Sequence, residues 1–358
     1  MVARVIALKE LLGRYNCTHA LVKDCADVEY ISGFKSSNAM LLVSQEKNVL
    51  FSDFRYQTAA QEFCERDDKW EFVMIDKENF GFLSQYLENG SRVGIQTNVL
   101  TMDQYRELKR ACKKVRFVRF SQQINSLSTQ KTATEIAHME RAAHIADTAF
   151  KSVLNSVVLG MTEFELAKSL ETMCRDYGSE KPSFDTIVLF GTRAALPHGV
   201  PGKQRLKKGD IILFDFGCTI HGMCSDMSRT VVAAKASAKQ KEIYEIVRQA
   251  QSRALSWVKA GRRCRSIDKK AREFITQAGY GDHFGHATGH GIGLRVHENP
   301  RINSTNSFIL QENCVITVEP GVYLDTTGGV RIEDMVQVTS HGFNLLTHSP
   351  KSLIELEL

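Results

Sequence analysis

The stretch from Phe214 to Asp226, F-D-F-G-C-T-I-H-G-M-C-S-D, decides the fold of the second part of this chain. Apolar residues dominate on both sides, and the runs Ile211–Phe216 and Met223–Ala233 predict two β-strands. Between them, His221 and Gly222 suit a two-residue turn, because an X-Gly pair tolerates the backbone angles of a tight hairpin. The sequence therefore predicts an antiparallel hairpin that carries two aspartates.

The register of this hairpin fixes where the two aspartates lie. With a two-residue turn, Ile220 faces Met223 and Asp215 faces Ser228. Asp226 is two residues from Ser228, so it lies on the same face of the sheet, diagonal to Asp215. Diagonal neighbours have Cβ atoms ~7 Å apart, close enough for two carboxylates to bind one metal pair. Two aspartates beside a hairpin are usually solvated, so this motif is not specific by itself.

Three more acidic or imidazole groups follow strand-like segments later in the chain. His290 lies in T-G-H-G-I-G-L, where glycines permit close approach of the backbone, and the interval His290–His297 alternates like a strand. Glu319 follows V-I-T-V and is expected to close a buried strand. Glu333 lies in V-R-I-E-D-M-V, which we expect to form one strand. Arg331, two residues away on the same face, is placed to orient a carboxylate.

These residues together predict a metal centre. Four carboxylates and one imidazole in one cleft must bind protons or recruit cations, because like charges at such short distances repel one another. Two divalent ions with shared carboxylates satisfy this requirement, and such a site with open positions is suited to hydrolysis. Oxygen-rich ligands favour Mn(II), with Co(II) or Zn(II) as alternatives. The predicted ligands are Asp215, Asp226, His290, Glu319 and Glu333.

Length and composition indicate an ordinary globular protein. The 358 residues favour two domains, and a net charge of +5 argues neither for nor against nucleic acid. The basic segment Lys109–Arg119 is interpreted as a solvated face, so we expect no nucleic-acid partner. No apolar run approaches ~18 residues, and the N-terminus is typical of an amphipathic helix rather than a signal peptide. We expect a cytoplasmic protein without a membrane partner.

Cysteine usage agrees with that expectation. The nine cysteines show no C-x-x-C pair and no regular spacing, a pattern that fits reduced thiols in the cytosol. Cys218 and Cys224 lie inside the hairpin segment beside two carboxylates, without a further cysteine pair. We therefore interpret them as small buried residues and not as zinc ligands.

The chain divides into a small α/β domain, residues 1–125, and a larger domain, residues 126–358. The segment Ser121–Lys131 is polar and weakly periodic, which places the boundary there. In the first domain the expected helices are Ala3–Tyr15, Tyr56–Arg66 and Met102–Ala111, the expected strands are His19–Val22, Ala39–Ser44, Asn48–Ser52, Arg92–Gln96 and Val115–Phe120, and Lys23–Val28 is expected to be a turn.

The second domain contains an internal repeat. A helical pattern over Thr134–Val157 ends at Gly160 and a second one runs to Gly178; about one hundred residues later Lys239–Lys259 ends at Gly261 and another runs to Gly279. The glycines are 18 residues apart in both copies, with Leu166 matching Ile267 and Met173 matching Phe274. Two unrelated helical hairpins are the alternative. A true repeat predicts two helix–helix–strand copies about a pseudo-twofold axis, with a cleft between them.

The motifs as an ordered set resemble the pita-bread metallopeptidases, a family that includes methionine aminopeptidase, aminopeptidase P, prolidase and the metal-free creatinase. The motifs that carry the resemblance are L-P-H-G, F-D-F-G to S-D-M-S-R-T, H-A-T-G-H-G-I-G-L, V-H-E, V-E-P-G-V-Y and R-I-E-D. The resemblance implies a creatinase-like α/β domain followed by a pita-bread domain. It implies that the five predicted ligands hold two metals, and that His198, His286 and His297 contact the substrate or a proton in transit.

The first domain narrows the resemblance. Y-I-S-G-F, S-S-N-A and F-S-D-F-R-Y-Q-T-A resemble segments of creatinase, prolidase and aminopeptidase P, whereas methionine aminopeptidase lacks this domain. Because all five ligands are present, the resemblance implies an X-Pro peptidase rather than a relative that has lost its metals. Arg193 and Arg295 depart from residues frequent in the family at those positions. Neither is a ligand, so they bear on substrate preference.

The resemblance implies cleavage of the X-Pro bond by a metal-activated water, with His198 or His297 stabilising the oxyanion and Glu319 transferring a proton to the prolyl nitrogen. Arg301 lies where prolidases carry an arginine that pairs with a dipeptide carboxylate; a surface arginine is the alternative. The S-S-N-A and D-F-R-Y segments favour Xaa-Pro aminopeptidase over Xaa-Pro dipeptidase, with a non-catalytic peptide-binding module as the remaining hypothesis. Proline-containing peptides are the expected partners, and relatives suggest a homodimer.

Overall fold

The computed structural model describes residues 2–76 and 80–358. The chain divides into two compact units, with the boundary in sequence between Ser128 and Thr129. Both units mix helices with β-sheets, as expected for the fold class. Within the described residues, no helix combines the length and apolar content that crossing a bilayer requires.

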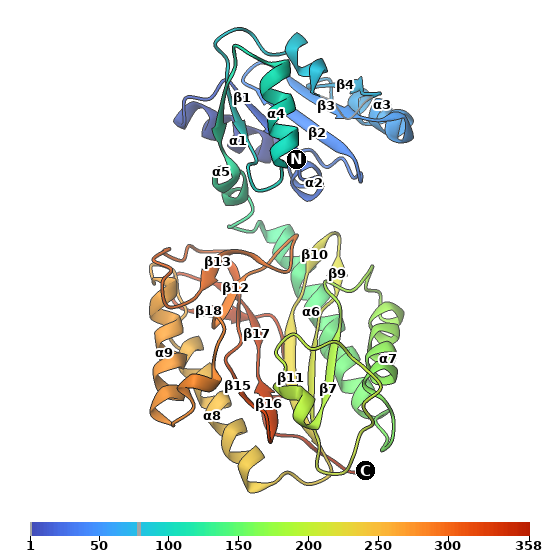
Figure 1. Ribbon diagram of the computed structural model, residues 1–358, viewed down its shortest axis with the longest axis vertical. Coiled ribbons are helices and arrows are strands. Elements are labelled where there is room, and N and C mark those ends of the chain that lie inside the picture. The colour runs from blue at the N-terminus through green and yellow to red at the C-terminus, as the bar shows by residue number, and fades with distance from the viewer. Residues whose placement is uncertain (1, 77–79) are drawn as a thin grey trace. The chain divides into compact units, whose positions relative to one another are not determined.

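The first unit is a twisted sheet with helices packed on it (Figure 1). The described strands run in the order β4-β3-β2-β1-β5-β6, with β1 antiparallel to β2 and parallel to β5. Its buried core is built from apolar residues such as Leu21, Phe51 and Leu108. The elements are α1 (Val2–Arg14), β1 (His19–Val22), α2 (Cys25–Ser32), β2 (Ala39–Ser44), β3 (Asn48–Ser52), α3 (Gln57–Arg66), β4 (Trp70–Met74), β5 (Arg92–Ile95), α4 (Met102–Ala111), β6 (Arg116–Arg119) and α5 (Ser121–Ser126).

One expectation for this unit is wrong. The segment Lys23–Val28 is not a turn, because helix α2 begins at Cys25. The Asp24 side chain accepts hydrogen bonds from two backbone N–H groups of the first turn and thereby caps the helix. The first part of the polar segment Ser121–Lys131 forms α5, and the boundary between the two units lies within this segment. The basic residues of Lys109–Arg119 are exposed, as expected.

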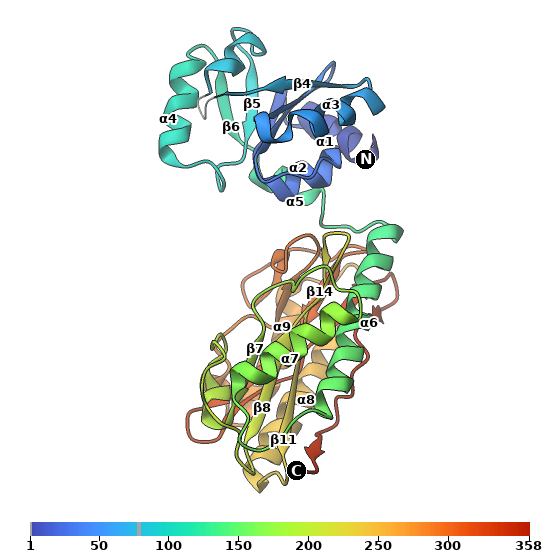
Figure 2. The same cartoon turned by 90° about the vertical axis from the view of Figure 1, so that its right-hand side faces the viewer.

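The second unit consists of two similar halves whose sheets lie between two pairs of helices (Figures 1 and 2). One half packs helices α6 and α7 on the sheet β19-β11-β8-β7, and the other packs α8 and α9 on the sheet β13-β12-β14-β17-β18. This is the pita-bread architecture. The elements are α6 (Ala133–Leu154), α7 (Glu163–Asp176), β7 (Ile187–Phe190), β8 (Ile211–Phe216), β9 (Thr219–Ile220), β10 (Met223–Cys224), β11 (Met227–Ala233), α8 (Ala238–Leu255), α9 (Cys264–Gln277), β12 (Gly289–Gly291), β13 (Glu298–Ile302), β14 (Val315–Val318), β15 (Gly321–Leu324), β16 (Gly328–Arg331), β17 (Asp334–Val338), β18 (Phe343–Leu345) and β19 (Glu355–Leu356).

The glycines that define the repeat have equivalent conformations. Gly160, Gly178, Gly261 and Gly279 all adopt positive φ, with values of 86°, 104°, 84° and 88°. An L-residue avoids this left-handed region, so glycine occupies these four turn positions without strain. Gly178 and Gly279 follow the ends of α7 and α9, whereas Gly160 and Gly261 lie in the turns that precede these helices, because α6 and α8 end earlier, at Leu154 and Leu255. The matched pair Leu166 and Ile267 is fully buried in both halves. The internal repeat is thus a repeat of structure.

Candidate metal centre

The hairpin of the first half has the predicted register. Ile220 pairs with Met223 and Asp215 pairs with Ser228. The turn residues His221 and Gly222 both have positive φ, 48° and 76°, as a tight two-residue turn requires. Asp226 lies directly before β11, where the ladder between the two strands is interrupted. Both aspartates therefore reach one face of the sheet.

Glycine is required where the hairpin strands approach each other outside the ladder. A Cβ atom at Gly217 would lie 1.9 Å from the carbonyl oxygen of Ser225. Cys218 and Cys224 on either side are buried, and neither belongs to the ligand group that the described residues form. This agrees with their interpretation as small buried residues.

The second half supplies its three candidate ligands from three separate segments. His290 lies in the centre of β12, Glu319 directly follows β14, and Glu333 lies between β16 and β17. The expected single strand around Glu333 is therefore wrong: the chain leaves one sheet after Arg331 and enters another at Asp334. The Glu333 N–H donates to the Ser228 carbonyl across the gap, 3.1 Å away.

The segment after His290 also differs from its expectation. Strand β12 ends at Gly291 and the chain runs as a loop to His297. A Cβ at Gly289 would lie 2.0 Å from the Thr317 carbonyl oxygen, and one at Gly291 would lie 2.3 Å from that of Asn299. The glycines thus permit the close backbone approach that was expected. The alternation after them does not form a strand.

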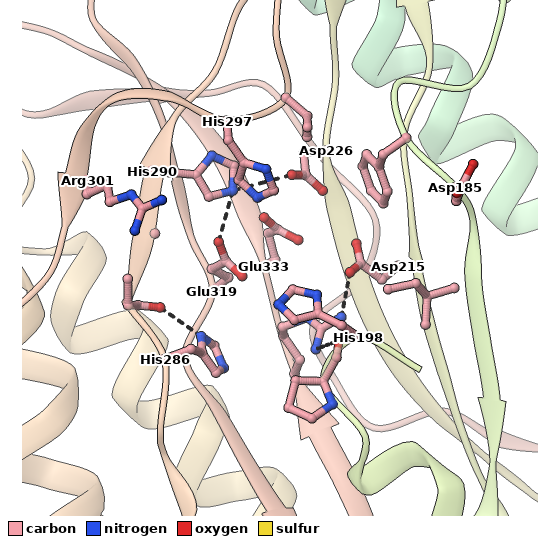
Figure 3. A pocket seen from close by; sticks show the side chains of 17 residues that line it. Asp185, His198, Asp215, Asp226, His286, His290, His297, Arg301, Glu319 and Glu333 are labelled. Atoms are coloured by element: carbon pink, nitrogen blue, oxygen red, sulfur yellow. Dashed lines mark hydrogen bonds and ion pairs between the residues drawn. The ribbon is translucent and has the colours of Figure 1, made fainter. Parts of the chain in front are cut away.

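The side chains converge in one cavity of about 570 Å³ (Figure 3). His290 Nε2 lies 3.2 Å from Glu319 Oε1 and 3.6 Å from Asp226 Oδ2. One ligand atom each of Asp226, His290 and Glu333 lies within 4.8 Å of the others. The His290 Nδ1 atom donates to the Gly291 carbonyl, 3.1 Å away, which directs Nε2 toward the carboxylates.

The electrostatics of this cluster fit a cation. Burial raises the pKa of Asp226 and of Glu333, and the neighbouring carboxylates raise both further. Burial would also raise the pKa of Glu319, but the hydrogen bond and charge of His290 hold it at about 2. Asp215 Oδ1 and Glu333 Oε1 are buried without a hydrogen-bond partner. Buried acceptors with neither proton nor donor are costly, and a divalent metal satisfies them.

Arg331 links the ligands of the two halves. Its guanidinium donates to Asp215 Oδ2 at 2.5 Å and to the Ser228 hydroxyl at 2.7 Å, and Ser228 donates to Glu333 Oε2 at 2.8 Å. Arg331 therefore orients a carboxylate as expected, but Asp215 directly and Glu333 only through Ser228. It also donates to the Tyr323 hydroxyl at 2.8 Å.

The predicted histidines and Arg301 line the same cavity. His286 is half-buried; its Nε2 accepts from Tyr323 at 2.9 Å, while its Nδ1 donates to the Ala287 carbonyl. His198 and His297 are exposed at the cavity. The rings of His290 and His297 lie 4.4 Å apart. The structure thus brings together all the residues predicted for the site.

The loop that carries His297 is held by a buried ion pair. Lys131 Nζ lies 2.9 Å from Glu298 Oε2, and their side chains are 2% and 5% exposed. The other carboxylate oxygen of Glu298 accepts from the Arg295 N–H at 3.2 Å. Arg295 thus takes part in this loop through its backbone. The ion pair fixes the residue that follows His297.

Arg193, the other residue that departs from the pattern of the family, has a local structural role. Its guanidinium lies 3.0 Å from the carboxylate of Glu163, whose side chain is fully buried, and it donates to the Val200 carbonyl at 2.8 Å. Glu163 also accepts from the Gly202 N–H. These contacts order the loop in which His198 lies.

Several residues of the site escaped the sequence analysis. Tyr323 and Ser228 connect Arg331 to other site residues, and Thr317 donates to Glu319 Oε1 at 3.0 Å. Thr317 could have been found from the sequence, because it is a polar residue inside an apolar buried strand. Phe184 and Asp185 also line the cavity, and they carry no motif of their own.

Comparison with known proteins identifies the family. The model of metallopeptidase family M24 matches residues 137–340, and that of the creatinase/prolidase N-terminal domain matches residues 4–127. The chain belongs to metallopeptidase family M24. The resemblance in the motifs is therefore confirmed, and M24 membership makes the chain a metallopeptidase that uses divalent metal ions.

Relatives of this M24 chain match it over almost their whole length. A Xaa-Pro dipeptidase of Pyrococcus furiosus is 33% identical over 99% of this chain and 100% of its own. The structure of a Xaa-Pro dipeptidase from Bacillus anthracis superposes with a TM-score of 0.93 at 34% identity, covering 99% of both chains. The structure of an X-Pro aminopeptidase from Thermotoga maritima reaches 0.89 at 34% identity, covering 98% of this chain and 99% of that one.

Proposed function

We propose that this metallopeptidase is a Xaa-Pro dipeptidase. The observation that carries the proposal is the position of Arg301, which lines the cavity that contains the candidate ligands. No hydrogen bond or ion pair joins its guanidinium to another residue that the structure describes, so the group is free to bind a carboxylate. The sequence motifs favoured an aminopeptidase, but the names of the relatives support the dipeptidase better.

The cavity's own residues provide the ligands for the metal. Asp215, Asp226, His290, Glu319 and Glu333 would hold two divalent ions, and hard carboxylate oxygens favour Mn(II) over softer metals. Such a metal pair supplies an activated water as nucleophile and polarises the substrate carbonyl. Arg331 and Ser228 position the carboxylates of opposite halves before substrate arrives.

The remaining residues bind the substrate and move its protons. His198 and His297, exposed at the cavity, are placed to donate to the scissile carbonyl oxygen as negative charge develops there. Glu319 accepts the proton of the attacking water and delivers it to the prolyl nitrogen. His286, held by Tyr323, lies on the same side of the cavity as Arg301 (Figure 3).

The identity of the bond follows from proline itself. A prolyl nitrogen carries no hydrogen, so peptidases that bind the amide N–H of their substrate cannot use it. A site that holds the carbonyl from one side and the terminal carboxylate from the other does not need that donor. Arg301 makes the site selective for a proline that ends the peptide.

A matched pair of variants tests the role of Arg301. Arg301→Met should raise KM for Gly-Pro by about tenfold or more, since a hydrogen bond to a charged group contributes about 1.5–3 kcal/mol. Arg175→Met removes an exposed arginine from α7 and should leave KM unchanged. An Arg301→Met enzyme with the wild-type KM would remove the basis for a dipeptidase.

Xaa-Pro aminopeptidase is the second candidate, favoured by the Thermotoga maritima structure. Hydrolysis of Gly-Pro compared with Arg-Pro-Pro by the Mn(II)-loaded protein separates the two. Cleavage of Gly-Pro alone supports the dipeptidase, and faster cleavage of Arg-Pro-Pro supports the aminopeptidase. The homodimer stays a prediction, which light scattering coupled to size-exclusion chromatography tests.

A further inference from the structure

The cavity contains one acidic group that the proposed reaction does not use. Asp185 lines the cavity beside Phe184 and Ile187, and its side chain is exposed. Its carboxylate forms no hydrogen bond or ion pair with any residue that the structure describes. The other acids of the lining belong to the candidate ligand set. Asp185 is therefore a free negative charge at the edge of the site.

The position of Asp185 follows from the strand pairing. Ile187 begins β7 and pairs directly with Asp215 on β8. Asp185 precedes Ile187 by two residues, so the two are ~6.6 Å apart along an extended chain. In Figure 3, Asp185 and Arg301 lie on opposite sides of the cavity, with the candidate metal ligands between them. The two free charges of the lining, one acidic and one basic, thus bracket the reaction centre.

This arrangement orients a dipeptide. If the prolyl carboxylate pairs with Arg301 and the scissile carbonyl lies at the metal ligands, the residue before proline must lie on the side of Asp185. Its α-amino nitrogen is separated from the carbonyl carbon by a single atom, Cα, and stays near the ligand cluster. Only an extended side chain reaches the edge of the cavity.

We propose that Asp185 is a specificity-determining residue that favours a cationic side chain, lysine or arginine, in the residue before proline. The inference rests on the proposed function and specifies its substrate. Phe184 and Ile187 provide an apolar wall for the aliphatic part of such a side chain, whose charged end meets the Asp185 carboxylate. A glutamate at the same position of the substrate is disfavoured by repulsion.

The test compares dipeptides that differ in the charge of the first residue. The Mn(II)-loaded wild type and the Asp185→Asn variant are assayed on Arg-Pro, Leu-Pro and Glu-Pro at low ionic strength. In Asp185→Asn the ratio of kcat/KM for Arg-Pro to that for Leu-Pro should fall about threefold, within the range for an exposed ion pair. Asp185→Lys should reverse the order of Arg-Pro and Glu-Pro. Added salt should reduce the wild-type preference, because it screens exposed charges.

The controls separate this inference from the proposed function. Asp176→Asn removes an exposed acid at the end of α7, outside the cavity lining, and should keep the wild-type ratios. If the dipeptides are hydrolysed but Asp185→Asn leaves the ratios of their kcat/KM values unchanged, the inference about Asp185 is wrong and the proposed function stands. An equal loss on all three substrates overturns the inference too, because it would assign Asp185 to the substrate backbone. No hydrolysis of any Xaa-Pro dipeptide by the wild type overturns the proposed function, and this inference with it.

Discussion

The half of the catalytic unit that carries α6 and α7 and the half that carries α8 and α9 share one architecture, but they build the metal centre differently. The first half supplies Asp215 and Asp226 from a single hairpin, within twelve residues of sequence. The second half supplies His290, Glu319 and Glu333 from three separate segments. The two halves therefore share one architecture, but the ligands of the first half are close together in sequence and those of the second half are far apart in sequence.

The contacts between the halves show how the two contributions are joined. Arg331 of the second half holds Asp215 of the first, whereas Ser228 of the first half holds Glu333 of the second. Each half thus orients a carboxylate of the other. Two of the five candidate ligands, Asp215 and Glu333, are therefore positioned by contacts across the two halves, so the site requires the complete unit.

The largest effect is expected from removing one ligand of each half. Asp226→Ala and Glu333→Ala should both abolish turnover and metal binding, by more than the ~100-fold that loss of a partner behind the ligands causes. Metal analysis and Gly-Pro hydrolysis measure both properties. Asp176→Ala and Asp282→Ala, exposed acids from the two halves, serve as controls. If either ligand variant keeps full activity, the two halves do not contribute jointly.

The next effect concerns stability and comes from a buried ion pair between the halves. Arg229 on β11 donates to Asp334 on β17 at 2.7 Å, and both side chains are 1% exposed. Arg229→Met leaves Asp334 with less compensation and should lower the free energy of unfolding by about 3–5 kcal/mol. Urea denaturation measures it. The exposed pair of Lys269 and Glu273 is the control, since its removal should cost at most about 0.5 kcal/mol.

A smaller effect should follow from the reciprocal support of the ligands. Ser228→Ala removes the hydroxyl that joins Arg331 to Glu333 and should weaken metal affinity by about 10- to 100-fold. Isothermal titration calorimetry with the metal ion measures this affinity. The buried hairpin residue Thr230, which bonds only backbone groups of Arg331, provides the control Thr230→Val. Equal affinities in Ser228→Ala and the wild type would mean that the halves orient their ligands independently.

The positions of the ligands in the first half were predictable from sequence, and those in the second half only in part. The register of Asp215 and Ser228 follows from alternation and an X-Gly turn, both properties of adjacent residues. By contrast, the contact of Arg331 with Asp215 joins residues 116 positions apart, and that of Lys131 with Glu298 joins residues 167 apart. No local pattern encodes such pairs. The ligand set was still identified, because clustered like charges require a cation wherever the chain brings them together.

The wrong elements have two different origins. The loop from Gly291 to His297 alternates in polarity like a strand, but where β12 ends depends on its partner strands β13 and β14, which pair with it only at Gly289 and Gly291. Helix α2 is a different case, since its cap Asp24 is a local signal that was present in the sequence and was not used.

The smallest effect tests the frame itself rather than the chemistry. Gly160 and Gly261 occupy equivalent positions in the two halves, with φ of 86° and 84°, and a Cβ atom would meet nothing within 4 Å at either. Gly160→Ala and Gly261→Ala should therefore cost the same, about 1 kcal/mol, which is the strain of a left-handed L-residue alone. Thermal unfolding of both variants measures the cost. Gly342→Ala, equally uncrowded but without positive φ, is the control. If the free energy of unfolding falls by clearly different amounts in the two variants, only the order of elements is repeated. The two turns that contain Gly160 and Gly261 would then contribute differently to stability.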